Sequence, residues 1–127
     1  MRKAPLAAVC AIWLVAGGCR TTPAAGSPES EAASRVLADF IAAAEGGDFR
    51  RAYQLLSGEW RAKYTPARLE QDFADEPLAR ERLERARGAL SRGPRFLDAE
   101  VAEFPIGAGR AVRLVREHGD FRVAALE

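Results

Sequence analysis

Apolar residues recur at helical spacing from Ser34 to about residue 92. They form four stripes, each of which predicts a helix with one buried face. The members of the stripes are Val36, Leu37, Phe40, Ile41 and Ala44; Phe49, Ala52, Tyr53, Leu56 and Trp60; Leu69 and Phe73; and Leu78, Leu83, Ala86 and Leu90. The first half of the domain is therefore expected to be helical.

Turn-forming and capping residues divide the stripes. Gly46-Gly47 ends the first helix, and Ser57-Gly58 should weaken or end the second before Trp60. Start signals precede the last three helices: Asp48, Thr65-Pro66 and Asp75-Glu76-Pro77. Gly93-Pro94 ends the helical series.

The period changes from helical to alternating after Pro94. Leu97, Ala99 and Val101 alternate with more polar neighbours, which predicts a first strand that Pro105 ends or places at an edge. A second strand is expected over 111–115, with Val112 and Leu114 inward, and a third over 121–125, with Phe121, Val123 and Ala125 inward. The order predicts an α+β domain, with N-terminal helices packed on a short curved antiparallel sheet of about three strands.

The first nineteen residues have the layout of a secretory signal. Arg2 and Lys3 precede an apolar run over 6–16, and Gly17-Gly18 then leads directly to Cys19. The segment Val15-Ala16-Gly17-Gly18-Cys19 resembles the bacterial lipobox. That resemblance implies cleavage before Cys19 and lipidation of its thiol. Two alternatives are a transmembrane helix, although the run is about half of the ~20 residues needed, and a cleaved signal without lipid.

This interpretation divides the chain into three parts. Residues 1–18 are the signal peptide, 19–33 are the lipidated cysteine and a flexible tether rich in small and polar residues, and 34–127 are one small α+β domain. The lipobox resemblance implies a location in the cell envelope. Arg20, where an inner-membrane retention signal often has Asp, favours an outer-membrane lipoprotein facing the periplasm.

Charge and cysteine content exclude several kinds of chemistry. Removal of Arg2 and Lys3 with the signal changes the net charge from +1 to −1, so nothing indicates a nucleic-acid partner. Both cysteines, Cys10 and Cys19, lie in the first nineteen residues, so the domain has no disulfide and no thiolate for a metal. We expect no cofactor and no metal.

Two segments resemble the nuclear-transport-factor-2-like superfamily. One runs from Val36 to Ser57 and contains Gly47-Asp48 and Ala52-Tyr53-Gln54-Leu55-Leu56; the other comprises Val112 to Val115 and Gly119 to Val123. The resemblance implies a curved sheet wrapped around a long helix in a cone. Catalytic members of that superfamily place an acidic residue, often with His or Tyr, inside the cone. No residues of this sequence can be matched to those positions.

Aromatic side chains are the best candidates for a ligand pocket. Tyr53, Trp60, Tyr64 and Phe73 could line the mouth of a cone, because pockets favour aromatic walls with few polar groups. The alternative is that these rings belong to the core. An enzyme would also need a buried carboxylate nearby, for which the candidates are Glu59, Asp72 and Asp75. His118, the only histidine, falls in a predicted hairpin turn.

A basic stretch near the last helix could contact anionic lipid or an acidic partner, or form a solvated helix face. Its arginines are Arg80, Arg82, Arg85, Arg87, Arg92 and Arg95. Taken together, the sequence predicts a membrane-anchored envelope lipoprotein with a non-catalytic binding domain. Its partner could be another envelope protein, peptidoglycan or an assembly complex. The alternative is a small-molecule carrier or an enzyme with an aromatic-lined cone pocket.

Overall fold

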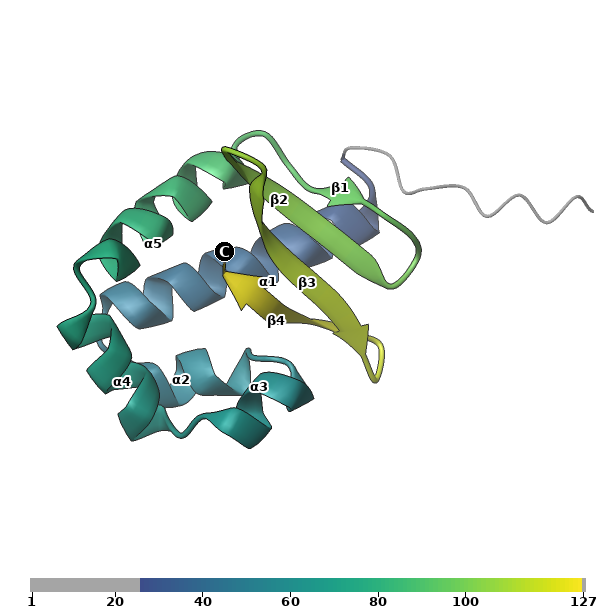
Figure 1. The fold of residues 1–127 in the computed structure, drawn as a ribbon. Helices are drawn as coiled ribbons and strands as arrows, with labels where there is room; N and C mark the ends of the chain where they lie inside the picture. The colour runs from purple at the N-terminus through teal and green to yellow at the C-terminus, as the bar shows by residue number, and fades with distance from the viewer. Residues whose placement is uncertain (1–25, 127) are drawn as a thin grey trace, which may run out of the picture.

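The computed structural model describes residues 26–126 and shows helices followed by an antiparallel sheet (Figure 1). The helices are α1 (Pro28–Glu45), α2 (Phe49–Gln54), α3 (Gly58–Lys63), α4 (Pro66–Asp75) and α5 (Pro77–Leu90). The strands are β1 (Arg95–Phe96), β2 (Val101–Gly107), β3 (Arg110–Glu117) and β4 (Asp120–Leu126). The α+β class is confirmed. The sheet has four strands in the described residues, because the two-residue β1 adds a short edge.

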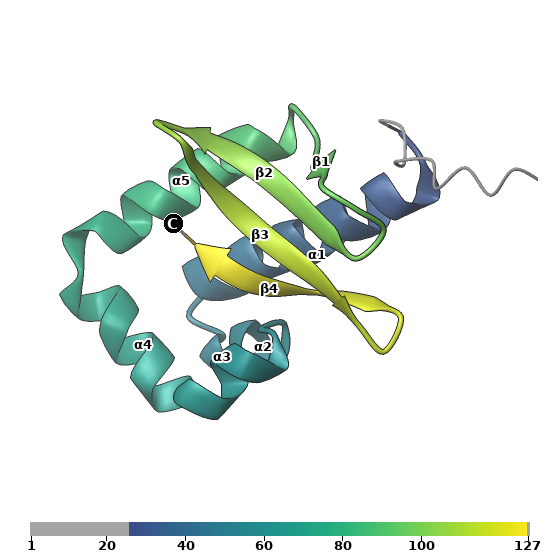
Figure 2. The same cartoon turned by 45° about the vertical axis from the view of Figure 1, so that its right-hand side comes forward.

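The strands form a meander in the order β1-β2-β3-β4, and the helices cover one of its faces (Figures 1 and 2). α1 crosses behind the sheet and contacts β4, whereas α5 packs on β2 and on α1. The largest fully buried side chains come from α1 and from the inner face of the sheet: Phe40, Phe104, Phe121, Leu37, Leu114, Val112 and Val123. The core therefore joins the first helix to the last three strands. None of the helices within residues 26–126 combines the length and the apolar character needed to cross a bilayer.

α1 begins earlier than the apolar stripe predicted. Ser27 caps the helix by accepting a hydrogen bond from the Ser30 amide at 3.1 Å, and Pro28 occupies the first turn. Residues 28–33, expected in the tether, are therefore helical, and Ser30 and Ala33 are buried. The expected start at Ser34 was wrong because this turn carries the same cap-then-proline signal as Thr65-Pro66 within a polar composition. Cys19 and the rest of the predicted tether up to residue 25 lie outside the described residues.

The other helix boundaries follow the capping residues of the sequence. Asp48 and Thr65 accept hydrogen bonds from the amides of Arg51 and Arg68, both at 3.1 Å, as N-caps do. Ser57 caps α3, so the second predicted stripe is divided into α2 and α3. One predicted core position is wrong: Leu78, in the first turn of α5, is 50% exposed.

The first predicted strand was placed in the wrong phase. Leu97 is 52% exposed and residues 97–100 form a bend, whereas the inward residues of β2 are Ala102, Phe104 and Ile106. The Asp98 carboxylate accepts hydrogen bonds from the amides of Glu100 and Val101 at 2.7 and 2.9 Å, which fixes this bend. β2 also continues through Pro105, which pairs with Ala111 of β3 but lies beyond the end of β1, so that within residues 26–126 its other side has no paired strand.

The inward residues of the other two strands were predicted well. Val112, Leu114, Phe121 and Val123 are all buried, whereas Ala125 is half-buried. Two-residue turns join β2 to β3 and β3 to β4, with positive φ at Ala108 (55°) and His118 (51°) and at the glycine after each. His118 is therefore an exposed turn residue, as the sequence indicated.

The segment between α2 and α3 pairs with the outer edge of β4. The Val123 amide donates to the Leu55 carbonyl, and the Ser57 amide donates to the Val123 carbonyl, both at 2.8 Å. These bonds cover an edge that would otherwise expose unpaired backbone groups. They also fix α3 beside the end of the sheet, which forms one wall of the site described next.

Candidate ligand pocket between the helices and the sheet

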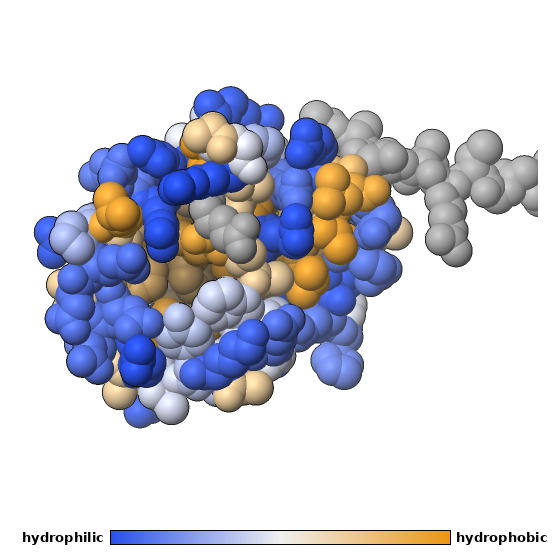
Figure 3. Space-filling model, in the orientation of Figure 1, coloured by the Kyte–Doolittle hydropathy of each residue, from blue (hydrophilic) through white to orange (hydrophobic). Residues whose placement is uncertain are grey.

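A cavity of about 450 Å³ lies between helices α3, α4 and α5 on one side and β4 on the other. The space-filling view shows a hollow with an apolar interior and hydrophilic residues around it (Figure 3). Its apolar walls include Phe40, Leu56, Leu69, Phe73 and Val123. The volume falls within the range of small-molecule sites, which are ~300–1,000 Å³ and mostly apolar.

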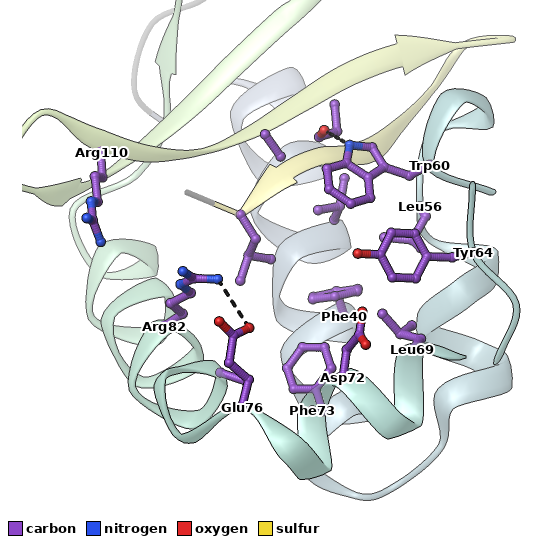
Figure 4. A pocket seen from close by; sticks show the side chains of 15 residues that line it. Phe40, Leu56, Trp60, Tyr64, Leu69, Asp72, Phe73, Glu76, Arg82 and Arg110 are labelled. Carbon is purple, nitrogen blue, oxygen red and sulfur yellow. Dashed lines mark hydrogen bonds and ion pairs between the residues drawn. The ribbon is translucent and has the colours of Figure 1, made fainter. Parts of the chain in front are cut away.

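Trp60 is held in the wall by the irregularity of β4. The pairing of β3 with β4 shifts between Arg113 and Leu114, so that Val123 and Ala125 have partners and Ala124 does not. The Ala124 carbonyl accepts a hydrogen bond from the Trp60 indole N–H (Figure 4). The Trp60 ring stacks on Tyr64, with centroids 5.2 Å apart and an interplanar angle of 29°. The bulge thus provides the acceptor that orients the largest aromatic side chain of the wall.

Two further contacts fix α3, which carries Trp60. Both oxygens of the Glu117 carboxylate, at the end of β3, accept hydrogen bonds from the Gly58 amide, at 2.8 Å (Oε1) and 3.0 Å (Oε2). The carboxylate also lies 3.9 Å from the Arg61 guanidinium. The Tyr53 hydroxyl donates to the Arg61 carbonyl at 3.0 Å. These bonds join α2, α3 and β3, so the position of Trp60 depends on three separate elements.

Tyr64 and Asp72 bring polar groups to one side of the cavity (Figure 4). Burial and the neighbouring Asp72 carboxylate raise the pKa of the Tyr64 phenol above its ordinary value of 10.0. Asp72 also accepts a hydrogen bond from Arg68 at 3.0 Å. Tyr64 is therefore a neutral hydrogen-bonding group at physiological pH.

The other side of the mouth carries Glu76, Arg82 and Arg110. Glu76 and Arg82 form an ion pair at 3.8 Å, and Arg110 extends toward them from the start of β3 (Figure 4). Glu76 lies between α4 and α5, Arg82 belongs to α5, and Arg110 belongs to β3. Because β3 is distant from α5 in sequence, the three charges come together only in the folded domain. Charged side chains thus surround the opening while aromatic and aliphatic side chains form the interior.

The residues predicted for the pocket are only partly brought together. Trp60, Tyr64 and Phe73 line the cavity, whereas Tyr53, on α2, is outside the lining and donates a hydrogen bond to the backbone of α3. Of the three candidate carboxylates, Asp72 alone lines the cavity. Glu59 and Asp75 are exposed, and Glu59 pairs with Lys63 at 3.0 Å.

Sequence reasoning missed the charged residues of the mouth. From the sequence, Arg82 was named only as part of a basic stretch and Glu76 only as part of a helix start, and Arg110 was not singled out. Most arginines of that stretch lie on the surface; Arg85 pairs with Glu81, for example, as on a solvated helix face. Within residues 26–126, no group of three or more His, Cys, Asp or Glu side chains is placed to hold a metal ion.

A second charged cluster lies on the opposite face of the sheet. Glu103, on β2, is held between Arg95 of β1 at 3.0 Å and Arg113 of β3 at 2.8 Å. The Arg113 and Arg95 guanidinium groups, which donate hydrogen bonds to the carboxylate, lower the pKa of Glu103 below its ordinary value of 4.5. This cluster ties three strands together and contributes nothing to the cavity walls.

Comparison of the chain with models of protein families, with curated proteins and with solved structures gives no match.

Proposed function

We propose that this protein is a non-catalytic binding protein of the cell envelope whose domain takes a small, mainly apolar ligand in the cavity. One observation carries the proposal: a space of about 450 Å³ with aromatic and aliphatic walls and polar groups gathered at its opening. A side-chain-filled core would leave no such space, because protein interiors are packed as densely as organic crystals.

The way in which the walls are held supports a binding role. Trp60 is fixed by the Ala124 carbonyl and by stacking on Tyr64, so its surface is already oriented before a ligand enters. A preformed wall lowers the entropy lost on binding. Glu76 and Asp72 each have an arginine partner, which leaves them in structural roles at the mouth.

The proposed location rests on the sequence. A lipid on Cys19 would hold the domain at a membrane surface, with the outer membrane and the periplasmic side favoured by Arg20. Cys19→Ala should release the protein from membranes into the soluble fraction. If Cys19→Ala protein still partitions into the detergent phase as the unmodified protein does, the lipid anchor is refuted. The proposal for ligand binding in the cavity is not affected by this result.

The resemblance to the nuclear-transport-factor-2-like superfamily is part of the same proposal. The long helix α1 packs on one face of the sheet (Figure 2). A cavity lies between this sheet and the helices. This arrangement supports a cone-like domain used for binding.

A neutral fluorescent probe tests the binding role. We expect N-phenyl-1-naphthylamine to bind the full-length protein with a blue shift and increased emission. Ala79→Phe should abolish this signal, because Ala79 is 6% exposed and lines the cavity, which the larger ring would fill. Ala67→Phe is the matched control, since Ala67 is exposed on α4 and outside the lining.

The two variants make the outcome decisive. Loss of probe binding in Ala79→Phe alone, with both variants folded by circular dichroism, supports the proposal. No binding to the unmodified protein, or equal binding to both variants, would refute it.

A further inference from the structure

We infer that the ligand is an amphiphile with one anionic head group, such as a medium-chain carboxylate, and that Arg110, with Arg82 beside it, binds this head. The inference rests on the proposed function and adds the chemical class of the ligand. It comes from the side of the opening where Glu76, Arg82 and Arg110 lie, opposite Tyr64 and Asp72.

Arg110 supplies the excess positive charge. It lines the cavity from the start of β3 and extends toward Arg82 and Glu76 (Figure 4). Among residues 26–126, no carboxylate lies within 4.0 Å of the Arg110 guanidinium, whereas Arg82 has Glu76 at 3.8 Å. This side of the opening therefore carries two guanidinium groups and one carboxylate, a net charge of about +1, while Asp72 on the other side pairs with Arg68.

Arg82 also keeps unused hydrogen-bonding capacity. Its Nε is shielded from solvent and donates no hydrogen bond to any residue between 26 and 126. Its contact with Glu76, at 3.8 Å, is an ion pair that is longer than a hydrogen bond. A buried N–H without an acceptor is unfavourable, so a shift of the Arg82 side chain that brought this group to an anionic oxygen in the cavity would be stabilised.

The rest of the cavity suits an apolar tail. From the mouth, a chain would extend along Phe73 and Leu69 toward Phe40 and Leu56, which form the interior with Val123. A space of about 450 Å³ lies near the lower end of the ~300–1,000 Å³ range of small-molecule sites, which suits a small ligand such as decanoate. The planar guanidinium fork of arginine matches the two oxygens of a carboxylate.

A matched pair of ligands separates the head from the tail. Decanoate and decan-1-ol share the apolar chain and differ in charge. Full-length protein with Trp13→Phe has Trp60, in the cavity wall, as its sole tryptophan, so its fluorescence reports binding directly. Titrations are made at low ionic strength and below the concentration at which either ligand aggregates, because salt screens an exposed charge.

The expected result is tighter binding of decanoate than of decanol, and a loss of this preference in Arg110→Gln. That variant should bind decanoate about tenfold more weakly, which equals a change of about 1.4 kcal/mol, with decanol unchanged. Arg110→Lys, which keeps the charge without the fork, should lose less. Arg50→Gln is the control for overall charge, since Arg50 is exposed on α2 and outside the cavity lining.

Three outcomes would overturn the inference: equal affinity for the two ligands, equal losses in Arg110→Gln and Arg50→Gln, or a parallel loss of decanol binding in Arg110→Gln. In each of these the neutral probe still binds, so the proposed function stands. If the neutral probe does not bind the unmodified protein, both the proposed function and this inference are refuted.

Discussion

Replacement of Glu103 by Gln tests how the outer face of the sheet is held together. The Glu103 side chain is 9% exposed and accepts three hydrogen bonds. One comes from Arg95 Nη2 at 3.0 Å, and two come from Arg113, from Nη2 at 2.8 Å and Nε at 3.2 Å. The substitution keeps the shape and removes the charge. It also turns an amide NH₂ toward a guanidinium group, which cannot accept a hydrogen bond.

The magnitude follows from the exposure of the partners. Arg95 and Arg113 have side chains 66% and 51% exposed, so both regain water when the carboxylate is lost. Each pair is therefore closer to a surface ion pair, worth ~0.2–1 kcal/mol, than to a buried one. The shielded carboxylate and its three bonds raise the total, and we expect Glu103→Gln to lower the free energy of unfolding by about 1–2 kcal/mol at pH 7. For a domain of this size, the melting temperature should fall by roughly 5–10 °C.

The same contribution should depend on pH in a defined direction. The folded-state pKa of Glu103 is lowered, so the folded protein holds the carboxylate ionised where the unfolded chain begins to protonate it. The stabilisation is therefore present above the ordinary value of 4.5 and is lost as the pH falls through the folded-state pKa. The stability difference between wild type and Glu103→Gln should shrink steadily as the pH drops below 4.5.

Urea unfolding followed by circular dichroism at pH 7, 5 and 3 measures both effects. Glu100→Gln serves as the control, because Glu100 is an exposed carboxylate in the neighbouring bend that forms no ion pair with residues 26–126. A Glu103→Gln variant as stable as the control at pH 7 would refute the reasoning. So would a difference that persists unchanged at pH 3.

Two further predictions concern the core and the cavity. Leu37→Ala should lower the free energy of unfolding by ~2–5 kcal/mol, because Leu37 is fully buried, whereas Leu97→Ala, at a 52% exposed leucine, should change it by less than ~0.5 kcal/mol in the same urea experiment. In Tyr53→Phe protein, ultraviolet absorbance should show Tyr64 ionising above pH 10.0, and stability should decline as the pH rises past that value. Adding Asp72→Asn should lower this transition toward pH 10.0. A transition that Asp72→Asn leaves unchanged would refute the role of that carboxylate.

The sequence predicted most of the fold because capping residues and apolar stripes agreed with each other. Asp48, Ser57 and Thr65 marked real helix boundaries, and Val112 and Leu114 marked the inward face of β3. The agreement failed over 97–106, where two alternating apolar sets occur in opposite phases. The bend that Asp98 fixes separates the exposed set from the set that faces the helices, and the alternation of apolar residues alone does not distinguish the two sets.

The cavity was harder to predict than the fold because its parts are distant in sequence. The aromatic side chains Trp60, Tyr64 and Phe73 could be proposed, since they lie close together along the chain. Arg110 could not, because only the folded domain brings the start of β3 to the same cavity as α4 and α5. Tyr53 was assigned to the pocket for its residue type, yet its hydroxyl instead bonds to the backbone of α3.

The bulge at Ala124 has a consequence for the order in which the domain matures. The acceptor for Trp60 and part of the cavity wall come from β4, the last of the described strands, whereas the opposite walls come from helices that the ribosome makes first. A nascent chain that still lacks β4 can contain every helix but cannot yet have a cavity. Ligand binding would thus distinguish completed domains from partly synthesised ones, and a ligand present during folding would favour chains in which folding had reached its final step.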